Sequence, residues 1–199
     1  MSICYSIVSA LTACALLAGA AGYEAPDYLE EMVSAAVVCD WEAGLAAEAA
    51  LRERNEQLGL QEAEISFEDL LLLSKIMYAE AGSVWLSDEW KMCVGEVVLN
   101  RVASPEFANT IRDVLEQPGQ YYGKNNAYFD SLCPSERCVR LALRLLLGER
   151  VLCDPSVVFQ ANFVQGGGVH TTFVDGALGA TYFCYSIRPE IYAFSGALR

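Results

Sequence analysis

The stretch KIMYAEAGS, residues 75–83, places a glutamate inside what otherwise reads as the end of an apolar helix. Apolar residues recur at helical spacing from Leu72 onward, and Glu80 falls on the same helix face. That face is expected to be buried, where an unpaired charge is costly. Glu80 is therefore paired, at the rim of a cleft, or tuned for chemistry.

The ends of this helix can be predicted from its flanking residues. Ser66 is suited to the N-cap, and Glu68 and Asp69 place acids in the first turn, where they complement the helix dipole. Gly82 is suited to the C-cap. Glu80 then lies in the last turn beside a loop, at the expected wall of a cleft.

The remaining elements predict an α+β fold that is predominantly helical. Further helices are expected over residues 41–64, after Ser87, after Asn109 or Thr110, and after Pro134 or Ser135. Beyond Pro155, the segments VVFQANF and ATYFCYS predict two short strands, and the glycine run GGGVH between them reads as a flexible turn.

Composition limits the possible partners. The 199 residues are 54% hydrophobic, which is ample for a core, and the net charge of -13 argues against nucleic acid as a partner. We divide the chain into an N-terminal signal or anchor (1–22), a spacer or helical linker (23–65) and a catalytic domain (66–199).

An uncharged apolar run, residues 3–21, has the length of a secretory signal or a short membrane span. Ala18-Gly19-Ala20 offers a cleavage site, although no basic residue precedes Ile3. A cleaved signal, a membrane tether and a buried helix all remain open. The signal and tether readings place the protein outside the cell, in the wall or on the membrane.

Outside that run the chain has an even number of cysteines, so export predicts disulfides of undetermined pairing among Cys39, Cys93, Cys133, Cys138, Cys153 and Cys184. A zinc site is a poor alternative, because His170 is the single histidine and lies in the glycine-rich segment. We expect no metal and no cofactor.

The surviving chemistry is acid–base catalysis by carboxylates. The chain has no GxSxG elbow, P-loop or dinucleotide fingerprint, and no cysteine stands in a known nucleophile context. Glu80 is the best-placed acid, because apolar neighbours would raise its pKa and keep it protonated. Such a proton donor suits cleavage of a glycosidic bond.

Several motifs together resemble the SleB-type cell wall hydrolases, the spore-cortex-lytic family. The resemblance covers about residues 68–186 and rests on IMYAEAGS, VGEVVLNRVASPEFANTIRDVLEQPGQY, LALRLLLGE and VVFQANF. It implies a domain that cleaves peptidoglycan, related in architecture to lysozyme-like lytic transglycosylases, with Glu80 as the catalytic residue. In such an enzyme one glutamate protonates the glycosidic oxygen and then draws the proton from the muramoyl 6-hydroxyl.

Hydrolysis by two carboxylates would need a second acid across the sugar. Asp88 and Glu89 fit better as acids at a helix start. Glu96 stands on a helix whose neighbours are expected to be buried, where it could pair with Asn100 or Arg101.

The substrate-binding candidates are the polar and aromatic residues of these motifs. Aromatic faces stack on pyranose rings and amides bond hydroxyls, which selects Gln120, Tyr121 and Tyr122 for the sugar groove. The further candidates have an alternative role in the structure: Tyr78 could support Glu80 or pack, Asn100 could orient Glu80 or cap the next turn, Gln160 could bond substrate or backbone, and Glu96 is a second carboxylate. The turn AGSVW and the aromatic Tyr121 depart from the family pattern, which often has a longer turn and a Phe at these places. An amidase that cuts the stem peptide and a wall-binding module without turnover remain as alternatives.

Overall fold

The computed structural model describes residues 27–60, 65–122 and 126–192. Its helices are α1 (Tyr28–Val38), α2 (Trp41–Leu58), α3 (Phe67–Ala81), α4 (Asp88–Val102), α5 (Ile111–Glu116), α6 (Ala127–Ser131) and α7 (Glu136–Leu146). The strands are β1 (Val157–Ala161), β2 (Val169–Asp175) and β3 (Gly179–Tyr185), followed by a short 3-10 helix, Pro189–Tyr192. The described structure is mostly helical and has one small antiparallel sheet, which confirms the predicted α+β class. The likeness to lysozyme stays a prediction.

The helices begin where the sequence indicates. Each N-cap hydroxyl accepts a hydrogen bond of 3.1–3.4 Å from the backbone N–H three residues on, at Ser66, Ser87, Thr110 and Ser135. These bonds satisfy N–H groups that a helix leaves unpaired at its start. Local chemistry therefore fixes the start of α3, and the helix ends at Gly82 as expected.

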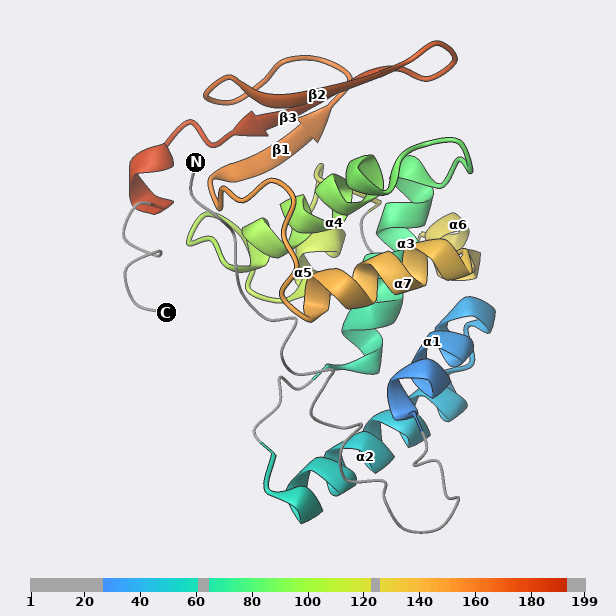
Figure 1. Ribbon diagram of the computed structural model, residues 1–199. Helices are drawn as coiled ribbons and strands as arrows, with labels where there is room; N and C mark the ends of the chain where they lie inside the picture. Colours follow the sequence, from blue (N-terminus) through green and yellow to red (C-terminus); the bar gives the residue numbers. More distant parts are fainter. Residues whose placement is uncertain (1–26, 61–64, 123–125, 193–199) are drawn as a thin grey trace.

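Helix α3 is the centre of the core, and its middle is buried around most of its circumference. It packs against α4, α5 and α7, and α4 in turn carries β1. Figure 1 shows the resulting tiers, with the sheet above α4 and the α1–α2 hairpin below α7. The C-terminal end of α3 points toward the sheet side of the molecule.

The region expected to be a spacer is helical but packs on the rest of the chain. Helices α1 and α2 form a hairpin whose side chains Met32, Val33, Ala36, Ala47 and Leu51 belong to the same buried cluster as α3. The hairpin contacts α7 and α3. Its described residues therefore contribute to the core instead of forming a free linker.

The sheet has three antiparallel strands in the order β1–β3–β2, where the sequence predicted two. The unpredicted strand is β2, and it contains His170, which was expected in a loop. The glycine run before it is also not a flexible turn. Gly166 has φ +61°, and a Cβ there would lie 2.2 Å from the Tyr185 carbonyl oxygen, so the run needs glycine to lie close against β3.

The structure contains no disulfide between the cysteines that it describes, which corrects the prediction from cysteine number. Cys93, Cys138 and Cys184 are buried, where a thiol packs as a small apolar side chain. Burial raises the pKa of Cys93 to about 12. An even count carries no information on which thiols come together.

None of the helices in the described ranges is long and apolar enough to cross a membrane. Residues 3–21, predicted as a signal or tether, lie outside those ranges.

Candidate active site

Glu80 lies in the last turn of α3 and is exposed to solvent, although the apolar stripe that precedes it is buried. Enough protein surrounds the carboxyl group for desolvation to raise its pKa, and a hydrogen bond from Tyr122 partly opposes this rise. The side chain is thus reachable from solvent while its protonated form is favoured. Glu80 is therefore an exposed carboxyl group with a hydrogen-bond partner, and not an unpaired charge on a buried face.

The turn after Glu80 is held by two features. A Cβ at Gly82 would lie 2.2 Å from the Tyr78 carbonyl oxygen, so only glycine lets the chain leave the helix this closely. The buried Lys91 of α4 donates from Nζ to the carbonyl of Ala81 and, at 2.7 Å, to that of Ser83. Lys91 therefore caps the end of α3 and fixes the backbone next to Glu80.

The hydrogen-bond partner of Glu80 is also held in place. The ring of Tyr122 stacks on Phe129 of α6 with centroids 5.2 Å apart, and its carbonyl accepts from Asn126 Nδ2 at 3.2 Å. Burial and the neighbouring Glu80 charge raise the pKa of Tyr122 to about 12. Its hydroxyl remains protonated at neutral pH and can donate to the Glu80 carboxylate.

Beside this pair, Arg101 stands between two aromatic rings. Its guanidinium carbon lies 4.8 Å from the Tyr121 centroid and 4.9 Å from that of Phe107. Its Nε donates to the Val158 carbonyl of β1 at 2.6 Å, which ties the end of α4 to the sheet. Burial raises the pKa of the Tyr121 hydroxyl; the Arg101 charge opposes the rise and the Glu80 charge adds to it. Glu80, Tyr121 and Arg101 thus form one electrostatic neighbourhood.

Some buried polar atoms of this region have no hydrogen-bond partner within the described protein. They include Arg101 Nη1, the Tyr121 hydroxyl and Gln160 Oε1. Gln160 lies on β1, two residues beyond the carbonyl that holds Arg101. Buried polar atoms are rarely left unpaired, so such atoms are expected to bond water or a ligand.

Glu96 does not pair with Asn100 or Arg101, and it is 1% exposed. Its carboxylate accepts three backbone N–H groups from the segment before β1: Val151 at 2.6 Å, Leu152 at 2.9 Å and Cys153 at 3.0 Å. Three successive N–H groups on one carboxylate account for a buried charge without any substrate. We therefore do not retain Glu96 in the site.

The other candidates lie in different environments. Asn100 is buried and its Nδ2 donates to the Asp154 and Val157 carbonyls, both at 3.0 Å, so its role in the structure is to hold the start of β1. Tyr78 is half-buried and packs over Gly82, whereas Gln120 is exposed on the loop before Tyr121. Glu80, Tyr121 and Tyr122 are the candidates that the fold brings into contact or charge interaction.

Residues 87–184, about half of the chain, match the family described as Cell Wall Hydrolase. This part of the chain belongs to the cell wall hydrolase family. The family implies an enzyme, an extracytoplasmic setting and the peptidoglycan of the cell wall as substrate. No curated protein and no solved structure matches the chain.

The matched residues of the cell wall hydrolase domain include Arg101, Tyr121, Tyr122 and Gln160, but they begin beyond Glu80. The family relationship confirms the resemblance read from the motifs. It leaves the catalytic role of Glu80 as a proposal.

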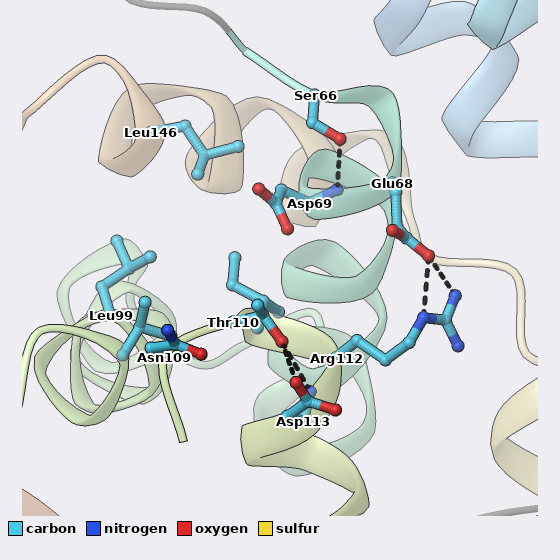
Figure 2. A pocket seen from close by; sticks show the side chains of 11 residues that line it. Ser66, Glu68, Asp69, Leu99, Asn109, Thr110, Arg112, Asp113 and Leu146 are labelled. Carbon is cyan, nitrogen blue, oxygen red and sulfur yellow. Dashed lines mark hydrogen bonds and ion pairs between the residues drawn. The ribbon is translucent and has the colours of Figure 1, made fainter. Parts of the chain in front are cut away.

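A cavity of about 530 Å³ lies at the other end of α3 (Figure 2). Arg112 pairs there with Glu68, and Thr110 hydrogen-bonds Asp113 at 2.8 Å. Burial, with Glu68 and Glu48 nearby, raises the pKa of Asp69. Asp69 and Glu80 are separated along α3 by roughly 16 Å at the rise of an α-helix, so this cavity is not part of the Glu80 site.

Sequence reasoning did not single out Lys91, and it considered Arg101 only as a residue that could orient Glu80, pair with Glu96 or cap a turn. The available signal was a charged side chain within a helix expected to be buried, the same signal that singled out Glu80. Within the described ranges, no cluster of His, Cys, Asp and Glu could hold a metal ion.

Proposed function

We propose that this protein cleaves the glycan strand of peptidoglycan as a lytic transglycosylase, with Glu80 as general acid and then general base. One observation carries the proposal: an accessible carboxyl group whose pKa is raised by desolvation and whose carboxylate form can accept a hydrogen bond from Tyr122. A raised pKa favours the protonated form of the carboxyl group, as a general acid requires.

The reaction uses Glu80 twice. The protonated carboxyl first donates to the glycosidic oxygen, and the departing sugar leaves with that proton. The resulting carboxylate is stabilised by Tyr122, and it then accepts the proton of the muramoyl 6-hydroxyl as that oxygen bonds to the anomeric carbon. A 1,6-anhydro ring forms, no water is consumed, and Glu80 ends protonated.

The positions of the neighbouring acids favour this one-carboxylate scheme over hydrolysis by a pair. Glu96 is buried on backbone N–H groups, and Asp88 Oδ1 pairs with Arg137 Nε at 2.6 Å at the start of α4. Glu89 is in the same first turn, as its dipole position predicted. A hydrolase with two carboxylates would need one of them across the sugar from Glu80.

Unpaired polar atoms around Arg101 are our candidate partners for the sugars on either side of the scissile bond. Arg101 Nη1 is an unpaired donor and Gln160 Oε1 an unpaired acceptor, and the Tyr121 hydroxyl can act as either. The hydroxyl and acetamido groups of the glycan supply both kinds of partner. Because this polymer lies outside the cytoplasmic membrane, the proposal also places the protein there, with residues 3–21 as its export signal or tether.

Product analysis on purified peptidoglycan tests the proposal. Transglycosylation yields anhydromuropeptides. New reducing ends would show that the enzyme hydrolyses the glycan instead, and free stem peptides would show that it is an amidase. Glu80→Gln is expected to lower the rate about 10²–10⁴-fold, the usual range for loss of a general acid. Glu89→Gln makes the same change on an exposed acid of α4 and is expected to be harmless. Full activity in Glu80→Gln would remove Glu80 from the mechanism, and a wild-type protein that binds walls without cleaving them would be the wall-binding module.

A further inference from the structure

Two segments far apart in the sequence expose large apolar side chains next to one another. In the loop between α3 and α4, Val84 is 81% exposed and Trp85 61% exposed; at the β2–β3 turn, Leu178 is also exposed. We call these three side chains the Trp85 patch. Exposed apolar side chains that come together in this way are typical of a binding site.

A hydrogen bond joins the two halves of the Trp85 patch. The Trp85 indole donates to the Asp175 carboxylate, which also accepts from the backbone N–H groups of Ala177 and Leu178, both at 2.9 Å. These backbone bonds lower the pKa of Asp175, so the acceptor stays charged. Beneath the patch, Trp90 of α4 stacks on Phe173 of β2 with centroids 5.2 Å apart. The indole therefore has a polar partner at the β2–β3 turn while its ring remains exposed.

The loop that carries Trp85 is held at several points. Lys91 bonds the Ser83 carbonyl at 2.7 Å, and Arg137 Nη1 donates to the Val84 carbonyl at 2.7 Å. Leu86 is buried in the core. The loop is held by polar contacts of its backbone, while its apolar side chains face solvent. Packing within the protein therefore does not explain why these side chains are apolar.

We propose that the Trp85 patch binds the glycan strand at a sugar removed from the bond being cleaved. This inference rests on the proposed function, because it takes the same polymer as ligand. The loop that carries Trp85 directly follows the turn of Glu80 in the chain. An exposed indole ring matches the apolar face of a pyranose, and large aromatic side chains supply most of the binding energy in many interfaces.

Charge favours a glycan over a lipid surface as the occupant. Asp175 is part of the patch itself, Asp88 lies just beyond its loop, and the chain has a net charge of -13. An interfacial membrane site would need Lys or Arg around the apolar residues to attract anionic lipid headgroups. A polymer of sugars has a neutral backbone and tolerates these acids.

The test compares long glycan strands with a short fragment that spans only the sugars around the scissile bond. Trp85→Ala is expected to raise the KM for long strands about tenfold with kcat unchanged, the effect of losing an aromatic anchor outside the reacting atoms. The KM for the short fragment should stay the same. Trp85→Phe keeps a ring and should recover most of the affinity, and Ile187→Ala, an exposed apolar residue beyond the far end of β3, is the matched control.

A second measurement does not depend on turnover. In a Glu80→Gln background, long strands should alter the tryptophan fluorescence, and Trp85→Phe should abolish that change while leaving the fold intact. Equal KM values for long and short substrates in wild type and Trp85→Ala would overturn this inference while the proposed function stands. No cleavage by wild type would instead reject the proposed function. If the protein binds phosphatidylglycerol vesicles, and Trp85→Ala abolishes this binding without any effect on glycan, the ligand of the Trp85 patch is a membrane and not the glycan.

Discussion

Two glutamates of this protein occupy helices that touch each other, and they have opposite environments. Glu96 of α4 is buried and accepts three backbone N–H groups, which bind the segment before β1. Glu80 of α3 is exposed, is bonded to Tyr122, and has a raised pKa. The same side chain serves as a structural clamp in one place and as a proton donor, by our proposal, in the other.

The difference shows that burial alone does not identify a catalytic acid. A carboxylate whose oxygens are occupied by backbone N–H donors holds its segment in place and has no free position for a substrate. A carboxyl with few donors and partial desolvation is held closer to protonation. From the sequence, both looked like charges on apolar helix faces, and only their partners separate them.

The largest effect is expected from making the same substitution at both places. Glu96→Gln should lower the free energy of unfolding by about 3 kcal/mol, because charge-assisted hydrogen bonds are lost and the new amide N–H₂ faces a backbone donor. At a pH near the ordinary Glu pKa, the free energy of unfolding of Glu80→Gln should lie within about 0.5 kcal/mol of the wild-type value, as expected for an exposed site. Chemical denaturation of both variants measures this contrast.

The pH dependence sharpens the contrast at Glu80. A carboxyl with a raised folded pKa contributes stability that is present below its unfolded pKa and lost as pH rises through the folded pKa. Glu80→Gln removes that titration, so it should become the more stable protein, by a small margin, as pH rises above the ordinary Glu range. A wild-type protein that gains stability relative to Glu80→Gln over that range would show that the pKa is lowered instead.

The sequence predicts contacts between residues that are close along the chain better than contacts between residues that are far apart. The caps at Ser66, Ser87, Thr110 and Ser135 are local; the first two were predicted, and the other two were each one of two predicted positions. The partners of Glu96 lie more than 50 residues away, as does the β1 carbonyl that holds Arg101. Nothing in the residues around Glu96 indicates which distant N–H groups will meet it.

The sheet follows the same rule. Strand β1 was predicted from its β-branched run, but β2 was not, because VHTTFVD follows three glycines and is mostly half-buried or exposed. Its strand character comes from pairing with β3. The role of Lys91 was also missed, since the carbonyls that it binds become neighbours only when α3 and α4 pack.

A smaller effect is expected at Lys91, which links the two helices at the Glu80 end. Lys91→Met should cost about 2 kcal/mol of stability, because two carbonyls lose a charged donor while the methylene packing is retained. The turn that carries Glu80 should loosen, so kcat should fall at temperatures where the variant is fully folded. Lys91→Arg should restore part of both. Unchanged kcat in a folded Lys91→Met protein would reduce Lys91 to a purely stabilising residue.

The smallest effect, and the most specific, is expected at Tyr122. Tyr122→Phe keeps the stack on Phe129 but removes the hydroxyl that lowers the pKa of Glu80, so that pKa should rise further. The protonated acid then persists to higher pH, so the alkaline limb of the kcat/KM profile should move to higher pH. At the pH optimum, kcat/KM should fall roughly fivefold, because one hydrogen bond to the carboxylate is lost. Tyr128→Phe removes a neighbouring hydroxyl that is not bonded to Glu80 and is the control. If the alkaline limb does not move in Tyr122→Phe, a group other than Glu80 supplies the proton, because losing the Tyr122 hydroxyl must shift the pKa of the acid that it bonds.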